Sequence, residues 1–313
     1  MKKRMFVIAA LVALIGIGGW YLFLRGRITD ASSEVSSEEE GTSSDNGIDV
    51  STDYIREVSE GADAEQKEST LGYVTEGTEE YRGFVIDNVF HSVNEGDIHY
   101  NVYIPEGYDG SKPYALYVTL PGYEGLYFQG VAANIQSEEF GFEAQKYNSE
   151  MIVVAPQLSD WGETSANQTI ALTEYFLEQY NIDSSKVYGN GFSGGGETMS
   201  IVMGKRPDLF TAYLQVSSQW DGEYESVAER HLPVYFAIGS NDEYYGSEPT
   251  REAYDTFHSL YEQQGLTEVE IDELLVLDIK EHDYFTQRNM SNEHGGGGLF
   301  AYDEEIMGWL FSH

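Results

Sequence analysis

The chain has 313 residues, 41% of them hydrophobic and 14% aromatic, so it is long enough to bury a sizeable core. It carries 17 basic and 54 acidic residues, a balance that excludes nucleic acid as a partner because phosphate contacts need clustered Lys and Arg. Cysteine is absent, which excludes disulfides and thiolate chemistry. The histidines are scattered and the acidic stretches lack calcium-loop spacing, so we expect no metal and no cofactor.

Residues 1–27 differ in kind from the rest of the chain. After MKKR, about twenty residues carry no charge, and as a helix they would span the roughly 30 Å of a bilayer core. Trp20 and Tyr21, followed by Arg25 and Arg27, resemble an interfacial anchor, and no small-residue cleavage site is evident. We therefore predict a signal anchor in the cell membrane, with the remainder of the chain extracellular. A cleaved signal peptide, which would release a secreted protein, and a buried core helix are the alternatives.

The next segment, residues 28–70, is rich in Ser, Glu and Gly and poor in apolar residues. Such a composition cannot bury enough surface to offset the entropy lost on ordering. We predict an acidic, disordered linker that holds a domain away from the membrane.

Short apolar or alternating runs begin near Tyr73, and the later ones are separated by helix-length stretches. Strands that alternate with helices imply parallel crossovers, whereas the first two runs, joined by VNEGDI, predict an antiparallel hairpin at the sheet edge. We therefore predict a single α/β domain over 71–313, with about eight mostly parallel strands flanked by helices. The runs are RGFVIDNVF (82–90), HYNVYIP (99–105), YALYVTL (114–120), MIVVAP (151–156), KVYGNG (186–191), TAYLQVS (211–217), PVYFAIG (233–239) and ELLVLDI (273–279).

The segment YGNGFSGGGETM (188–199) sets one serine among five glycines, between an alternating run and a helix-compatible one. Gly191, Ser193 and Gly195 spell G-x-S-x-G, the nucleophile elbow, in which a serine occupies a strained strand-to-helix turn. Ser193 also falls at the carboxyl end of a strand, where ligands of α/β sheets bind. We predict that Ser193 is a nucleophile. The alternatives are a phosphate-binding loop, although the Lys-Ser/Thr ending of such loops is missing, and a purely structural turn.

A nucleophilic serine needs a base and a carboxylate downstream, in the order Ser, Asp or Glu, His. Asp242 follows the strand at 233–239, and its neighbour Glu243 could take the same role. For the base, His294 lies before four glycines that allow a flexible turn, whereas bulky residues follow His282. We predict Asp242 and His294, with Glu243 and His282 as their alternatives.

The oxyanion formed during acyl transfer needs fixed N–H donors, one from the residue after the serine and one from the loop after the third strand. These positions are Gly194 and Tyr123. Tyr127, Phe128 and Trp161 are candidate substrate-binding residues, and the alternative for each is an ordinary core position.

Four segments together resemble the bacterial α/β-hydrolases described as prolyl-oligopeptidase-like or polyhydroxybutyrate-depolymerase-like esterases. They are NVYIPEGYDGSKPYALYVTLPGYEG, GNGFSGGGE, IGSNDEYYGSEP and HGGGGLFAYDEEIMGWLF. The resemblance covers about 73–313 and implies the α/β-hydrolase fold, an eight-stranded sheet and a triad of Ser193, Asp242 and His294. Many relatives have His-Gly where this chain has Pro121-Gly122, and the propeller of true prolyl oligopeptidases has no counterpart in this sequence.

The residues and the resemblance predict a membrane-tethered extracellular serine hydrolase that forms an acyl-enzyme. A small-molecule carboxylic ester is the expected substrate. A serine peptidase acting on short peptides is the first alternative, because the same triad cleaves both bonds. A catalytically inactive surface-binding domain is the second.

Overall fold

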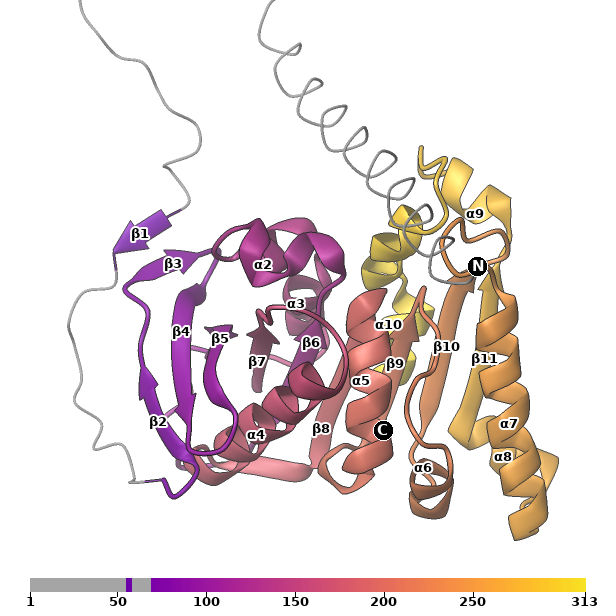
Figure 1. Ribbon diagram of the computed structural model, residues 1–313, viewed down its shortest axis with the longest axis horizontal. Coiled ribbons are helices and arrows are strands. Elements are labelled where there is room, and N and C mark those ends of the chain that lie inside the picture. The colour runs from indigo at the N-terminus through magenta and orange to yellow at the C-terminus, as the bar shows by residue number, and fades with distance from the viewer. Residues whose placement is uncertain (1–54, 58–68) are drawn as a thin grey trace, which may run out of the picture. The chain divides into compact units, whose positions relative to one another are not determined.

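The computed structural model describes residues 55–57 and 69–313 (Figure 1). Their centre is an 11-stranded sheet in the order β1-β3-β4-β5-β7-β6-β8-β9-β10-β11, with β2 paired to β4. The strands are β1 (Ile55–Glu57), β2 (Gly72–Thr75), β3 (Glu79–Tyr81), β4 (Phe84–Ser92), β5 (Gly96–Tyr103), β6 (Tyr114–Leu120), β7 (Met151–Pro156), β8 (Ile182–Phe192), β9 (Ala212–Val216), β10 (Val234–Gly239) and β11 (Leu275–Lys280).

Helices fill the connections between the parallel strands. The α-helices are α2 (Ala133–Ser137), α3 (Phe140–Glu143), α4 (Glu163–Gln179), α5 (Gly194–Lys205), α6 (Glu225–Arg230), α7 (Glu248–Gln264), α8 (Glu268–Leu274), α9 (His282–Thr286) and α10 (Glu304–Leu310). The 3-10 helices are η1 (Tyr123–Gly125), η2 (Tyr127–Gln129), η3 (Ala144–Lys146), η4 (Pro207–Leu209) and η5 (Gly295–Tyr302).

Each of the eight runs predicted from the sequence contains a strand, and the hairpin of β4 and β5 is antiparallel as expected. Strands β7, β6, β8, β9, β10 and β11 run parallel to one another. The sheet is larger than predicted because β1, β2 and β3 extend its antiparallel end. These three strands are only three or four residues long, too short to show a period in the sequence. Strand β1 lies within the stretch predicted as a linker.

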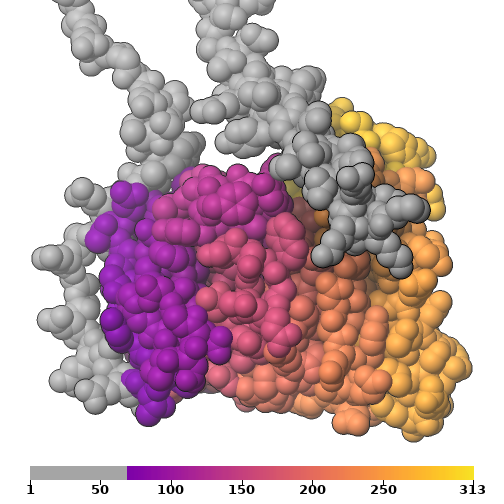
Figure 2. Space-filling model, viewed as in Figure 1, coloured from indigo at the N-terminus to yellow at the C-terminus, as the bar shows by residue number. Residues whose placement is uncertain are grey.

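Strand β6 shows why the central runs are apolar throughout. All seven of its residues are buried, with Leu116 and Val118 in one apolar cluster and Ala115 and Tyr117 in another. The first cluster takes side chains from α4, α5 and α7, and the second takes them from α3, η5 and α10. Helices therefore cover both faces of the parallel strands, as an α/β-hydrolase fold requires. In Figure 2, the segments from the indigo strands to the yellow C-terminal helices pack into a continuous surface.

The predicted anchor over 1–27 lies outside the described residues, as does most of the predicted linker. Within residues 55–57 and 69–313, no helix is both long and apolar enough to cross a membrane.

Candidate active site

Three connections that follow parallel strands bring the predicted triad residues together. Ser193 joins β8 to α5, Asp242 follows β10, and His294 directly precedes η5. The Oγ of Ser193 lies 3.0 Å from Nε2 of His294, and Nδ1 of His294 lies 2.9 Å from Oδ2 of Asp242. This is the hydrogen-bond order in which a histidine can take a proton from a serine while a carboxylate orients the ring.

The backbone at Ser193 is strained, with φ +54° and ψ −125°, a conformation that favours glycine over residues with a Cβ. Glycine is required on both sides of Ser193 because other backbone atoms lie very close to these positions. A Cβ on Gly191 would lie 2.4 Å from the carbonyl oxygen of Gly195, and one on Gly195 would lie 2.5 Å from the carbonyl oxygens of Leu120 and Pro121. The glycine cluster therefore packs the turn against its neighbours and presents the serine hydroxyl at its tip.

Asp242 is buried, and both oxygens of its carboxylate have hydrogen-bond partners. Oδ1 accepts hydrogen bonds from the backbone N–H groups of Tyr244 and Tyr245, at 3.0 and 2.9 Å, while Oδ2 faces the imidazole of His294. The two backbone donors fix the orientation of the carboxylate.

The two predicted alternatives, Glu243 and His282, contact other groups. Glu243 accepts hydrogen bonds from the backbone N–H groups of Glu293 and His294, at 3.1 and 2.9 Å. His282 pairs with the buried carboxylate of Glu293 at 2.9 Å. Glu293 also accepts a 2.7 Å hydrogen bond from the backbone N–H of Asn241. Glu243 and Glu293 thus cross-link the loop that carries Asp242 to the loop that carries His294.

Aromatic rings enclose the imidazole of His294. The ring of Phe192 stacks on it with centroids 5.6 Å apart, and the rings of Tyr244 and Tyr245 lie at 5.4 and 5.6 Å. The hydroxyl of Tyr245 donates a 2.9 Å hydrogen bond to Glu197 in the first turn of α5. Burial, and then the charge of Glu197, raise the pKa of Tyr245, so this hydroxyl stays protonated. It ties the Asp242 loop to the elbow helix.

The two predicted oxyanion donors flank the serine. Gly194 begins α5, where N–H groups and the helix dipole favour negative charge. Tyr123 begins η1, and a Cβ on the preceding Gly122 would lie 3.3 Å from Cβ of Ser193. Among the described residues, no acceptor pairs with the N–H of Gly194 or of Tyr123. Both donors are therefore available to an oxygen bound beside Ser193.

The predicted substrate-binding aromatics divide into two groups. Trp161 and Phe128 are 40% and 61% exposed, and their rings lie 6.1 and 5.4 Å from that of Tyr123. Trp161 also covers the elbow, because a Cβ on Gly194 would lie 2.9 Å from the indole. Tyr127 points elsewhere and stacks on His99 with centroids 3.9 Å apart.

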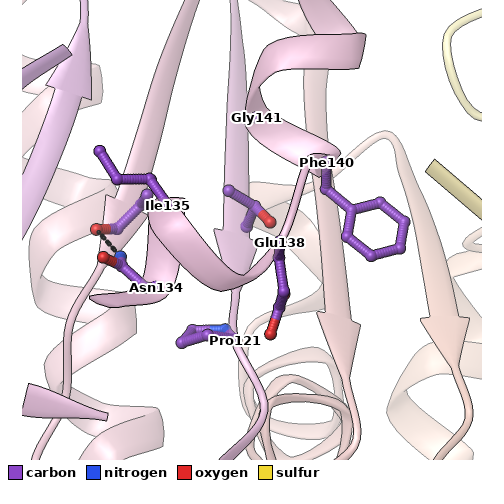
Figure 3. A pocket seen from close by; sticks show the side chains of 8 residues that line it. Pro121, Asn134, Ile135, Glu138, Phe140 and Gly141 are labelled. Atoms are coloured by element: carbon purple, nitrogen blue, oxygen red, sulfur yellow. Dashed lines mark hydrogen bonds between the residues drawn. The ribbon is translucent and has the colours of Figure 1, made fainter. Parts of the chain in front are cut away.

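Two small hollows meet at Pro121, beside the oxyanion donors. One is lined by apolar groups that include Leu126, Leu158 and Trp161. The other lies on the side of α2 and α3 and contains the carboxyl group of Glu138 (Figure 3).

Sequence reasoning missed Glu138, Tyr245 and Glu293 at this site. Glu138 accepts a 2.7 Å hydrogen bond from the backbone N–H of Gly122, and Tyr245 and Glu293 brace the loops as described above. None of them belongs to a motif, and each meets its partner across 16 or more residues of chain. A single sequence gives no signal for such pairs.

Comparisons with known proteins agree with this architecture. Residues 158–277, which include Ser193 and Asp242, match the model of the prolyl oligopeptidase family. Acetylxylan esterase A of Emericella nidulans is 22% identical over 179 residues, which are 51% of this chain and 53% of that protein. The chain thus spans about half the length of this relative.

Among solved structures, a thermostable esterase shares the fold with a TM-score of 0.60 and 18% identity, over 75% of this chain and 66% of the other. Oligopeptidase B from Leishmania major matches with a TM-score of 0.47 and 13% identity, over 74% and 37% of the two chains. The predicted resemblance to prolyl-oligopeptidase-like and esterase α/β-hydrolases is confirmed.

Proposed function

We propose that the chain is a serine hydrolase of the α/β-hydrolase fold and that it cleaves carboxylic esters, with Ser193 as nucleophile, His294 as base and Asp242 as the group that orients His294. The observation that carries the proposal is the continuous pair of contacts from Ser193 Oγ to His294 at 3.0 Å and from His294 to Asp242 at 2.9 Å. The strained φ of Ser193 adds support, because strain of this kind collects at functional sites.

In the proposed reaction, Ser193 Oγ attacks the ester carbonyl carbon while its proton moves to Nε2 of His294. The carbonyl oxygen becomes an oxyanion, and the N–H groups of Gly194 and Tyr123 donate hydrogen bonds to it. The C–O bond to the alcohol then breaks, and the alcohol leaves with the proton from His294. Water, activated by the same histidine, attacks the acyl-enzyme and releases the acid and Ser193.

The ester substrate is favoured by the relatives and by the site. One relative is named an acetylxylan esterase and the solved structure with the same fold is an esterase. Exposed Trp161 and Phe128 offer apolar ring surface beside Tyr123, where one side of a small ester could bind. A peptidase acting on short peptides is the second candidate, because the matching family model is that of the prolyl oligopeptidases.

The experiment is labelling of the full-length chain with a fluorophosphonate, alongside hydrolysis of p-nitrophenyl acetate and of a proline-specific chromogenic peptide. We expect labelling and ester hydrolysis, both lost in Ser193→Ala and both kept in Ser185→Ala, an exposed serine on β8. Faster turnover of the peptide than of the ester would favour the peptidase. A folded protein that neither labels nor hydrolyses would instead fit the inactive binding domain.

We also propose that residues 1–27 anchor the protein in the cell membrane with the hydrolase domain outside. The support is their sequence alone, about twenty uncharged residues between basic ends. Protease treatment of intact cells tests it, because an external domain is digested and an internal one is protected.

A further inference from the structure

Glu138 contacts the segment that carries one of the proposed oxyanion donors. It lies between α2 and α3, and its Oε1 accepts a 2.7 Å hydrogen bond from the backbone N–H of Gly122. We call residues Pro121 to Tyr123 the oxyanion loop, because the N–H of Tyr123, the next residue after Gly122, is one of the proposed oxyanion donors. The contact fixes the peptide next to this donor, so a change at Glu138 would shift the donor itself.

The surroundings of this carboxyl group disfavour a negative charge. Glu138 extends toward Pro121 into the small hollow beside α2 and α3, whose other lining residues are uncharged (Figure 3). From the elements packed around it, the titratable groups that face it are Tyr117 on β6 and Glu124 on η1. Among the described residues, no Lys, Arg or His forms an ion pair with it.

Burial, reinforced by the charge of Glu124, raises the pKa of Glu138 to about 8. The hydrogen bond from Gly122 opposes this rise without reversing it. Part of the residue is exposed, yet its carboxyl group lies in the hollow. At neutral pH the group therefore holds its proton and still accepts a hydrogen bond through Oε1.

We propose that Glu138 is a positioning residue of the oxyanion loop and that it works in its neutral, protonated form. The inference rests on the proposed function, because it concerns the loop assigned there as an oxyanion donor. A neutral carboxyl holds Gly122 in place and adds no charge. An ionised carboxylate at the same place would repel the oxyanion that forms beside Tyr123, across an interior that screens charge poorly.

The consequence for activity is a loss of rate at alkaline pH. As the pH rises through the pKa of Glu138, the loop gains a negative charge and the rate falls. We expect kcat/KM of the wild-type protein to fall about tenfold between pH 7 and pH 9.5.

The experiment compares full-length wild type, Glu138→Gln and Glu139→Gln from pH 6 to pH 10 with p-nitrophenyl acetate, after subtraction of spontaneous hydrolysis. Gln keeps an acceptor oxygen for Gly122 and cannot ionise, so Glu138→Gln should keep its activity and lack the alkaline fall. Glu139 pairs with Arg82 on the surface, so Glu139→Gln should follow the wild type. An alkaline fall unchanged in Glu138→Gln would overturn the proposal.

A second variant separates the positioning of Gly122 from the effect of the charge on Glu138. Glu138→Leu removes the acceptor, so we expect kcat to fall about a hundredfold at every pH with little change in KM. A kcat within twofold of the wild type would show that the contact with Gly122 does not position the loop.

Thermal unfolding tests whether Glu138 is protonated in the folded protein, independently of enzyme activity. The folded pKa of Glu138 is above that of the unfolded chain, so the folded state binds more protons between about pH 4.5 and pH 8. Stability contributed by this group is therefore present below that window and lost as the pH rises through it. Between pH 5 and pH 8, we expect the midpoint temperature of thermal unfolding to fall more in the wild type than in Glu138→Gln.

Two failures can be told apart. If the wild type neither reacts with the fluorophosphonate nor hydrolyses the ester, but the unfolding midpoints of wild type and Glu138→Gln diverge with pH, the proposed function fails although Glu138 is protonated. If the wild type is active and the midpoints run parallel, Glu138 is ionised in the fold and the inference is wrong.

Discussion

The elbow and the two loops that face it are held in place by different means. The elbow, between β8 and α5, is set by backbone packing, since Gly191 and Gly195 leave no room for a Cβ. The loops that carry Asp242 and His294 are set by the buried carboxylate of Glu293 and the exposed carboxylate of Glu243, each of which accepts hydrogen bonds from backbone N–H groups of the opposite loop. The proposed nucleophile, Ser193, is therefore fixed by backbone packing, and the proposed base, His294, is fixed by charge-assisted hydrogen bonds.

This difference predicts different sensitivities. A packing error at the elbow shifts the nucleophile and destabilises the fold, because the turn is part of the core. A missing carboxylate between the loops shifts the base and leaves the core intact. Substitutions at the histidines, the carboxylates, the glycines and the aromatic residues test that division.

The histidines should differ most sharply. His294→Ala removes the group that receives the proton of Ser193, so we expect kcat/KM for an ester to fall about 10⁴-fold or more. His282→Ala leaves the triad intact and removes one contact of Glu293, so we expect a fall of less than about tenfold. Steady-state hydrolysis of p-nitrophenyl acetate measures both. A larger loss in His282→Ala would mean that His282 is the base, and equal losses would mean that both histidines are needed.

The two adjacent acids give the next largest contrast. Asp242→Asn cannot hold the required tautomer of His294, and we expect kcat to fall about 10⁴-fold. Glu243→Gln weakens the hydrogen bonds to the backbone of Glu293 and His294, so we expect about a tenfold fall in kcat.

The same pair of variants can contradict the assignment. Circular dichroism should show both folded. A larger loss in Glu243→Gln than in Asp242→Asn would reverse the roles of the two carboxylates.

Most of the fold, and the three residues that meet at the site, Ser193, His294 and Asp242, could be predicted from the sequence because their signals are local. The eight longer strands, of five to eleven residues, lie in apolar or alternating runs, and the elbow places its glycines within two positions of Ser193. The short strands β1, β2 and β3 carry no comparable pattern, since their pairing partners and not their composition make them strands.

The parts of the site that could not be predicted depend on contacts between distant segments. Glu293 is a glutamate in an acid-rich chain, and nothing around it in the sequence marks the buried hydrogen bond to Asn241, 52 residues away. Likewise, no pattern around Glu138 in the sequence indicates its hydrogen bond with the backbone of Gly122. For the same reason Tyr127 and Phe128, neighbours in the sequence, end on different sides of the loop.

Glycine substitutions test whether shape alone fixes the elbow. Gly191→Ala forces a Cβ to within 2.4 Å of the backbone of Gly195, so we expect the free energy of unfolding to fall by about 3 kcal/mol, together with a loss of activity. Gly298→Ala is the matched control, because a Cβ there meets nothing within 4 Å. Urea denaturation measures both. Unchanged stability in Gly191→Ala would mean that the turn relaxes and that packing does not hold Ser193.

The smallest expected effect lies where the elbow meets the substrate. Trp161 covers Gly194 and is 40% exposed, so its indole can contact an ester bound at Ser193 as well as the backbone beneath it. We expect Trp161→Ala to raise KM about tenfold with a smaller change in kcat, because apolar contact is lost in the ground and transition states alike. Tyr127→Ala should change KM less than twofold, since that ring stacks on His99. If Tyr127→Ala has the larger effect on KM, the substrate lies on the His99 side of the loop and not over the elbow.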